Sequence, residues 1–252
     1  MTVLTIAARE LRALFLSPLA WVIAAVLTLV LAWLFLAQLQ FHLEYQGQMG
    51  GQMAGQAGVT ARVGVAVLST AGFIMLWIVP ILAMRLIAEE RARGTLTLLL
   101  ASPATLTEIV LGKFLGLFAL LALMLGAFVL MPLSLSLGTT LDWGHLGAAT
   151  LGALLALGAY AAIGLWCSSL TRSPTIAAVT AIGLMLLLYL FDVAGQLRSE
   201  ATEAARWVSL STHGASFSEG RFSTTDVAYY LIMMSTFLTL TVRRLDADRL
   251  PH

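Results

Sequence analysis

Six long apolar stretches, whose interiors lack charged side chains, constrain the fold of this chain more than any other feature of its sequence. A helix needs about 20 apolar residues to cross about 30 Å of hydrocarbon. Only 11% of the 252 residues are charged, whereas a soluble domain carries about 25%. The sequence therefore predicts an all-α integral membrane protein with a single transmembrane domain over residues 1–252. The predicted spans are residues 18–40, 63–87, 109–137, 145–170, 174–191 and 227–242.

The ends of these spans carry further signals. Ser17-Pro18 is a typical helix start, because serine caps helices and proline fits the first turn. The first span is too long for the apolar core of a signal peptide and is expected to stay in the membrane. Pro80 is expected to kink the second span. The last span, at about 24 Å, is marginal in length.

Residues 1–16 are too short and too charged to cross a bilayer, since they include Arg9, Glu10 and Arg12. Their apolar residues follow helical spacing, which predicts an amphipathic helix at the membrane surface. A frayed tail is the alternative. The apolar face is predicted to consist of Leu4, Ala7, Ala8, Leu11, Leu14 and Phe15.

The basic residues predict the orientation of the spans, because cytoplasmic loops carry an excess of Lys and Arg. Ten basic residues are cytoplasmic if the N-terminus is inside, and six spans then place both termini in the cytoplasm. The cytoplasmic set is Arg9, Arg12, Arg85, Arg91, Arg93, Lys113, Arg172, Arg243, Arg244 and Arg249. The outer set is Arg62, Arg198, Arg206 and Arg221.

Several function classes are disfavoured by what the sequence lacks. A net charge of +1 gives no basic field for nucleic acid. The single cysteine, Cys167, excludes an intrachain disulfide and a cysteine-cluster metal site. Ion-coupled carriers generally hold ionisable groups at membrane depth, which these spans lack. No GxxxxGK[ST] phosphate-binding loop occurs. A transporter of this kind would take its energy from a partner.

Ser211 and His213, with Asp142, Asp192 or Asp226 as the acid, are the candidate catalytic residues of an intramembrane enzyme. No GxSxG or HExxH motif supports nucleophilic or zinc catalysis. We therefore predict a chain with no catalytic residue and no cofactor of its own.

The linker between the first two spans contains a Gly/Gln/Met-rich segment at residues 47–58, which is typical of a flexible loop. His42, Met49 and Met53 offer ligands for a soft metal such as Cu(I). Methionine is also common filler, so no metal site is predicted there.

The longest polar break on the predicted cytoplasmic side runs from Met84 to Gly116. Residues 87–100 have the composition of a short helix, which Gly94 weakens or breaks. Thr105 and Glu108 have the spacing of a capping box that opens the third span. Small residues recur on span faces, in Gly112-x-x-x-Gly116 and from Gly144 to Ala156, and favour close packing within one bundle.

The outer segment before the last span, residues 192–226, is predicted to form one or two short helices at the outer leaflet. Its apolar members are expected to dip into the membrane interface, as aromatic residues do. They are Trp207, Val208, Leu210 and Phe217.

The run RLIAEERARGTLTLLLASPATLTEIVLGKFLG resembles the signature of ABC-2 type permeases, the membrane subunits of one class of ATP-binding-cassette transporters. The resemblance rests on Glu89-Glu90-Arg91, Gly94-Thr95, Leu98-Leu99, Ser102-Pro103 and Gly112-Lys113. The C-terminal part is similar to the gliding-motility-auxiliary branch, which is related to the nitrous-oxide-reductase maturation permeases.

The resemblance implies the permease subunit of an exporter, with residues 85–102 as a coupling helix that docks on a separate ATPase. That ATPase would hold the ATP–Mg. The permease itself would lie in the bacterial cytoplasmic membrane. Residues 1–16 would be the connecting helix, and a second copy or a homologous permease would complete the transporter. The implied docking residues are Arg85, Glu89, Glu90, Arg91, Arg93, Gly94, Thr95, Leu98 and Leu99.

The resemblance also implies that residues 196–224 form re-entrant helices that close the pathway on the outside. The implied gate residues are Trp207, Leu210, His213 and Phe217. Two other functions stay open: an ABC-linked assembly or motility scaffold that moves no substrate, and a stand-alone secondary carrier. Spans without charge fit a lipid-like or amphiphilic cargo better than an ion.

Overall fold

The structure is a computed structural model that describes residues 2–48, 58–95, 104–197 and 209–248. Leu98, Leu99 and Trp207, together with Ser102-Pro103, Val208, Met49 and Met53, lie outside these residues. Within them the chain is helical and contains no strand. Six helices in the described ranges are long and apolar enough to cross a membrane, which confirms the predicted all-α membrane fold.

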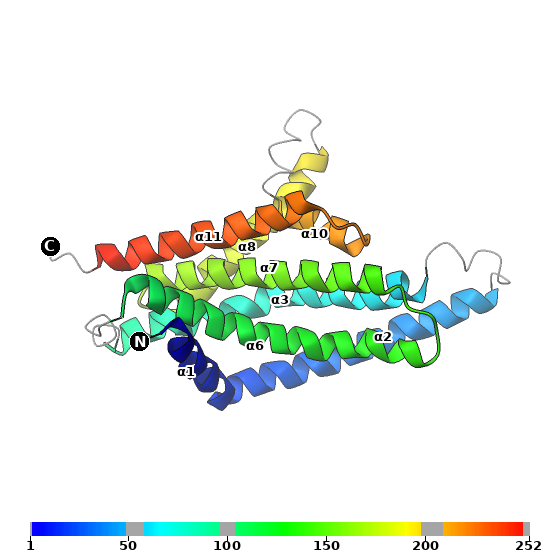
Figure 1. The fold of residues 1–252 in the computed structure, drawn as a ribbon, viewed down its shortest axis with the longest axis horizontal. Coiled ribbons are helices and arrows are strands. Elements are labelled where there is room, and N and C mark those ends of the chain that lie inside the picture. The colour runs from blue at the N-terminus through cyan, green and yellow to red at the C-terminus, as the bar shows by residue number, and fades with distance from the viewer. Residues whose placement is uncertain (1, 49–57, 96–103, 198–208, 249–252) are drawn as a thin grey trace.

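The helices in the described ranges are α1 (Val3–Leu16), α2 (Pro18–Gln48), α3 (Ala66–Met84), α4 (Glu90–Ala92), α6 (Leu106–Ser134), α7 (Trp143–Leu170), α8 (Pro174–Leu197), α10 (Leu210–Ser218) and α11 (Thr224–Ala247). Of these, α2, α3, α6, α7 and α11 run roughly along the long axis of the molecule (Figure 1). Three short turns adjoin them: the π-helical η1 (Thr60–Val65) and η2 (Arg85–Glu89), and the 3₁₀-helical η3 (Leu135–Leu137).

We call the two ends of the bundle after the short helices that lie there. The α1 end also holds the last turn of α11, and the α10 end holds the first turns of α7 and α11 (Figure 1). At 24 residues, α11 is about 36 Å long at 1.5 Å per residue. It is therefore long enough to cross, although its apolar stretch seemed short in the sequence.

α7 is the central helix of the bundle and packs against α3, α6, α8, α10 and α11. Its most apolar window is 61% buried inside the chain, against 22% for α2 and 17% for α11. Glycines allow this packing: a Cβ atom on Gly164 would lie 2.6 Å from the Cβ of Ala83 in α3. The faces of α2 and α11 are left to lipid or to another subunit.

The second span is one continuous helical rod from Thr60 to Ala92. Residues 87–100 were predicted to form a short helix; residues 87–92 are helical but continue the second span, and residues 96–100 lie outside the described residues. The π-helical turn η2 carries the rod without interruption from α3 into α4, with Pro80 inside α3. The end of the span and the start of the predicted coupling segment therefore form a single element.

α1 is a helix, as predicted, and it lies against α6. Its buried residues are Ile6, Glu10 and Leu14, one on each successive turn. Leu4 and Ala8, predicted for the apolar face, are exposed. Leu14 is buried as predicted, whereas Ile6 and Glu10 were not predicted for this face; Glu10 is buried because it has a buried partner on α6.

Candidate functional site

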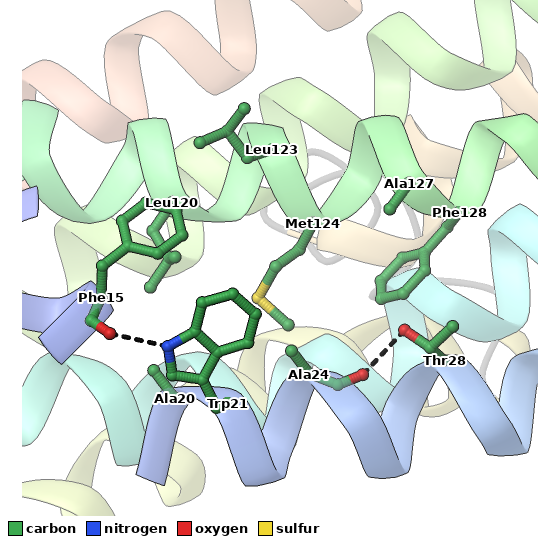
Figure 2. Close-up of a pocket in the computed structure, with 10 residues that line it drawn as sticks. All are labelled: Phe15, Ala20, Trp21, Ala24, Thr28, Leu120, Leu123, Met124, Ala127 and Phe128. Carbon is green, nitrogen blue, oxygen red and sulfur yellow. Dashed lines mark hydrogen bonds between the residues drawn. The ribbon is translucent and has the colours of Figure 1, made fainter. Parts of the chain in front are cut away.

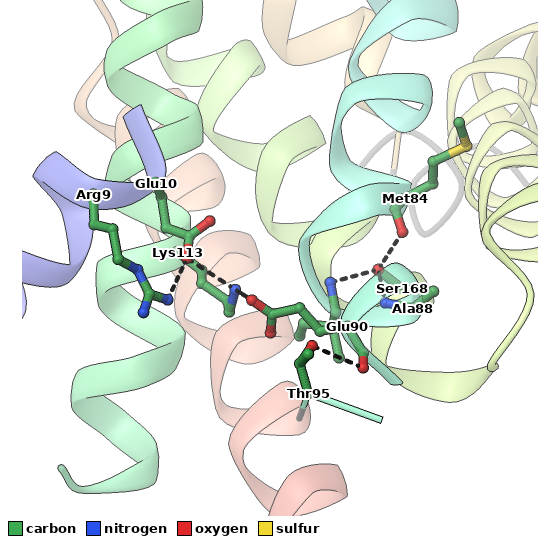
Figure 3. Close-up of polar contacts among 9 residues, drawn as sticks. Arg9, Glu10, Met84, Ala88, Glu90, Thr95, Lys113 and Ser168 are labelled. Atoms are coloured by element: carbon green, nitrogen blue, oxygen red, sulfur yellow. Dashed lines mark hydrogen bonds and ion pairs between the residues drawn. The ribbon is translucent and has the colours of Figure 1, made fainter. Parts of the chain in front are cut away.

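Lys113 lies at the centre of an ion-paired cluster at the α1 end. Its ammonium nitrogen is 3.1 Å from Oε1 of Glu10 in α1 and 2.7 Å from Oε1 of Glu90 in α4 (Figure 3). The side chain of Lys113 is only 1% exposed. Arg9 pairs with Glu10 at 2.9 Å, so two positive and two negative charges alternate. A lysine this deeply buried requires such partners, because an unpaired buried charge is costly.

Local sequence features bring the three helices of this cluster together. The capping box predicted for Thr105 and Glu108 is present at the start of α6 and fixes where that helix begins. Gly112 and Gly116 flank Lys113 and leave room for α1: an added Cβ would lie 2.6 Å from Ile6 and 2.7 Å from Glu10. The glycines thus let α1 approach until Glu10 reaches Lys113.

Ser168 of α7 holds the π-helical turn η2. Its hydroxyl donates to the carbonyl of Met84 at 2.9 Å and accepts from the backbone N–H groups of Ile87 and Ala88 at 3.2 and 3.0 Å. Figure 3 shows Ser168 beside Met84 and Ala88. A wider turn misaligns main-chain partners, and buried main-chain groups need a partner. One serine therefore ties the centre of the bundle to the end of the second span.

The rod ends at Gly94 in a Schellman motif. The N–H of Thr95 bonds to the carbonyl of Glu90 at 3.0 Å, and the N–H of Gly94 bonds to that of Arg91 at 3.3 Å. Gly94 has a φ of +73°, a left-handed conformation that glycine adopts without a side-chain clash. The predicted helix break at Gly94 is confirmed, and Thr95 continues the cap through its hydroxyl bond to Glu90 O.

The remaining residues of the predicted docking segment fall into two groups. Arg93 is 71% exposed and pairs with Glu89, which also lies 3.9 Å from Arg85. Arg91 is only 12% exposed and pairs with Asp248 at the end of α11. Arg85, Glu89 and Arg93 thus lie toward the surface, whereas Glu90 and Arg91 bind other helices of the same chain.

The mechanical meaning of this end follows from its connections. Side-chain bonds from the last turns of the second span reach α1 and α6 through Lys113, α7 through Ser168, and α11 through Asp248. Residues 85–95 are therefore bonded, directly or through Lys113, to four other helices. We call this arrangement the junction: Glu10, Glu90, Arg91, Lys113, Ser168 and Asp248.

A small apolar cavity of about 170 Å³ lies between α2 and α6 (Figure 2). Its two side-chain donors are bonded to main-chain carbonyls: Trp21 Nε1 to Phe15 at 2.7 Å and Thr28 Oγ1 to Ala24 at 2.7 Å. The cavity therefore offers a ligand only apolar contact.

At the α10 end, the predicted gate residues Leu210, His213 and Phe217 are buried on one face of α10. We expected Leu210 and Phe217 to dip into the membrane interface, and this was wrong. Phe217 packs on Gly152 of α7, where an added Cβ would lie 2.5 Å from the Cβ of Phe217. Gly152, which belongs to the small residues predicted for close packing, therefore lets α10 approach α7.

Asp226 anchors α10 to the start of α11. Nδ1 of His213 lies 2.5 Å from Oδ1 of Asp226, and the hydroxyl of Ser216 donates to the other carboxylate oxygen. The ring of Tyr229 stacks on His213 with centroids 4.0 Å apart. The sequence placed Asp226 only among possible acids. Its position ten residues after Ser216, across a glycine turn, could have suggested the contact.

Four of the candidate catalytic residues, Asp142, Ser211, His213 and Asp226, have structural partners. Asp142 caps α7 by accepting from the N–H of His145. The hydroxyl of Ser211 donates to the carbonyl of Tyr189. No group of three or more His, Cys, Asp or Glu side chains that could hold a metal occurs in the part of the chain that the structure describes.

Six helices of membrane-spanning length in the described ranges, joined at one end by a junction and closed at the other by a short buried helix, define a multi-pass membrane protein. Residues 4–206 match the family model described as ABC-2 family transporter protein, and the chain belongs to that family. No curated protein matches the chain. It is thus a membrane permease subunit of the ABC transporter class; the branch named above stays a prediction.

Proposed function

We propose that a separate ABC ATPase subunit drives this permease by docking at residues 85–102. The observation that carries the proposal is the junction, because it connects this segment to helices throughout the bundle. A helical rod fixed at several points transmits displacement, whereas an isolated surface loop would absorb it. In this proposal the ATPase subunit binds ATP–Mg, and this chain forms the transport pathway whose conformation changes when ATP is hydrolysed.

Within this segment, we assign two roles to its charges. Arg85, Glu89 and Arg93 are the surface charges that a partner can contact. Glu90 and Arg91 are internal links that carry the motion inward. α1 is the connecting helix, because its buried Glu10 joins the same cluster. The two groups therefore predict different failures: loss of docking for the first, and loss of transmission for the second.

The opposite end is proposed to be the gate. α10 packs on the bundle through Leu210, His213 and Phe217. The contact between Asp226 and His213 holds this gate helix in the closed position. The proposed direction is export, with both termini in the cytoplasm of a bacterium. The exposed apolar faces of α2 and α11 suit a second copy or a homologous permease as well as lipid.

Docking can be tested by co-purifying the ATPase with the permease. Arg85→Glu with Arg93→Glu reverses two exposed charges and should lower recovery of the ATPase by at least about tenfold. Arg221→Glu is the matched control, because Arg221 is 74% exposed, also pairs with a glutamate and lies at the α10 end. Unchanged ATPase recovery in the double variant would contradict docking at this segment.

The same preparation separates a transporter from a scaffold. Vesicles that contain both subunits should show ATP-dependent flux of an amphiphilic cargo, and the double variant should lose it. A complex that binds and hydrolyses ATP with no flux of any tested cargo supports the scaffold. Flux from the permease alone, without an ATPase, supports a stand-alone carrier.

A further inference from the structure

A second, larger cavity lies under α10 and has no role in the function proposed so far. It measures about 390 Å³, is lined by residues of α3, α7, α8, α10 and α11, and opens to the surface beside Ser69 and Phe73, which are exposed. Small-molecule sites in proteins usually measure about 300–1,000 Å³. Leu210 and Phe217, on the buried face of α10, form part of its wall. Its size and position are those of a ligand site inside one subunit.

The lining of this cavity selects against charge. None of its described lining residues is Asp, Glu, Lys, Arg or His, and Leu68, Phe73 and Phe217 supply apolar walls. An ion held among such groups would lose its hydration without gaining a partner. The cavity therefore suits an uncharged molecule with a substantial apolar part.

Two tyrosine hydroxyls in the cavity wall are available to bind a ligand. Most hydroxyls around it are already bonded: Tyr230 donates to the carbonyl of Leu210, Ser69 bonds to Ser218, and Ser211 donates to the carbonyl of Tyr189. Within the described ranges, the hydroxyls of Tyr160 and Tyr189 have no hydrogen-bond partner.

Tyr160 is the informative one, because the residue is only 5% exposed. Its hydroxyl oxygen has no partner and is not completely buried, so it is accessible from the cavity. A buried phenol normally has a hydrogen-bond partner. An acceptor atom on a bound molecule would supply it.

We propose that this cavity binds an uncharged amphiphile that accepts a hydrogen bond from Tyr160, through a group such as an ester or amide carbonyl. The apolar part of the molecule lies against Leu68, Phe73 and Phe217. The proposal stands on the cavity alone and does not require that an ATPase docks at residues 85–102. The cavity between α2 and α6 is a poorer candidate, because its donors are already bonded.

Gly72 provides a direct way to fill the cavity. It lines the wall, and a Cβ added there meets no atom within 4 Å. Gly72→Leu should therefore occupy the space without displacing a neighbour. Leucine also has a higher helix propensity than glycine. Gly126→Leu is the matched control: it makes the same change inside α6, where an added Cβ also meets open space and α6 contributes nothing to this cavity.

The probe is a monoacylglycerol whose acyl chain carries a diazirine, added to the full-length protein in detergent. After irradiation, mass spectrometry should locate the label on peptides of α3, α7 and α10. Gly72→Leu should reduce labelling at least about fivefold, and Gly126→Leu should leave it unchanged. Equal labelling of the parent and Gly72→Leu would overturn the proposal.

Two further measurements test the chemistry of the site. Tyr160→Phe keeps the ring and removes the donor, so probe affinity should fall about three- to tenfold, the effect of one neutral hydrogen bond. An alkyl sulfonate with the same diazirine chain should label these peptides far less than the monoacylglycerol. Preferential labelling by the sulfonate, or no effect of Tyr160→Phe, would contradict a neutral, hydrogen-bonded ligand.

The ligand can be a resident bilayer lipid or a transported molecule, and reconstitution with the ATPase distinguishes them. Release of the probe on ATP hydrolysis identifies a transported amphiphile, and retention identifies a resident lipid. Either outcome requires that labelling is lost in Gly72→Leu. Because labelling itself needs no ATPase, failure of the docking proposal and failure of this one are separable.

Discussion

The two ends of this bundle are held together by different kinds of interaction. At the α1 end, the junction joins helices through charges, and Lys113 has a carboxylate on either side. At the α10 end, hydroxyl groups and aromatic rings line a cavity, and the contact between His213 and Asp226 holds the short helix above it. Glycine packs helices tightly at both ends, through Gly112 and Gly116 at the first and Gly152 at the second, but only the second also has a glycine, Gly72, in an open cavity wall.

This difference teaches where the molecule is stiff and where it can change shape. Charge pairs that are buried on several helices break only together, because each unpaired charge is penalised. A helix that rests on a cavity has fewer contacts to lose when it moves. The four predictions that follow test this contrast between a stiff end and a yielding one, beginning with the largest effect.

Removing the central charge should destroy the stiff end. Lys113→Met leaves Glu10 and Glu90 facing one another without their cation, which should cost about 3–5 kcal/mol of stability. Thermal unfolding in detergent measures this loss. Adding Glu10→Gln and Glu90→Gln to the same variant should restore much of the stability, since no buried charge is then unpaired. A Lys113→Met protein as stable as the parent would show that the cluster is not a structural lock.

Separating α1 from α6 should weaken the same end by a different route. Gly116→Leu places side-chain atoms where Glu10 and the carbonyl of Ala7 lie, and overpacking of this kind costs about 3 kcal/mol. Limited proteolysis should then cut α1 faster than in the parent. Gly126→Leu, in the same helix but with open space around it, should leave the cleavage rate unchanged. Equal cleavage in all three proteins would contradict a clamped α1.

Much of the fold could be predicted from local patterns. The lengths of the apolar stretches predicted the spans, the Thr105-x-x-Glu108 spacing predicted a capping box, and Gly94 predicted the end of a helix. Each of these features depends on neighbours in sequence. Their physical causes, apolar length and main-chain capping, act over a few turns of one helix.

The site could be predicted only in part, because its partners are far apart in sequence. Glu10 and Lys113 are separated by 103 positions, and no local rule pairs them. The two glycines that permit the contact were recognised as small residues, but small residues do not name what packs on them. Hydropathy likewise could not reveal that His213 and Asp226 would be partners, since both read as polar loop residues.

At the yielding end, the expected effect is smaller and local. Asp226→Asn keeps the shape of the side chain and removes the charge that holds His213 and accepts from Ser216, a loss of about 2 kcal/mol. Hydrogen exchange should quicken in α10 and in the first turn of α11, while α6 and α1 keep their protection. Faster exchange at both ends would mean that the two ends form one cooperative unit.

The smallest effect should come from the cap of the second span. Gly94→Ala forces a side chain into a left-handed conformation, at a cost of about 1 kcal/mol. The melting temperature should fall slightly, and the ion pairs of Lys113 should survive. Because Gly94 has open space around it, a clash cannot explain the loss. A fall as large as that of Lys113→Met would place the cap, and not the charge cluster, at the centre of the stiff end.

The π-helical turn at Arg85–Glu89 makes chain length itself a determinant of this end. Such a turn holds one residue more than the α-helical turn that it replaces, and each residue rotates a helix by about 100°. Glu90 follows directly and points at Lys113 (Figure 3). Deleting one residue between Met84 and Glu90 would therefore let this turn close to α-helical width with Glu90 still facing Lys113, whereas deleting a second residue would rotate the carboxylate about a quarter of the way around the axis. The number of residues in this segment, and not only their types, therefore determines whether Glu90 faces Lys113.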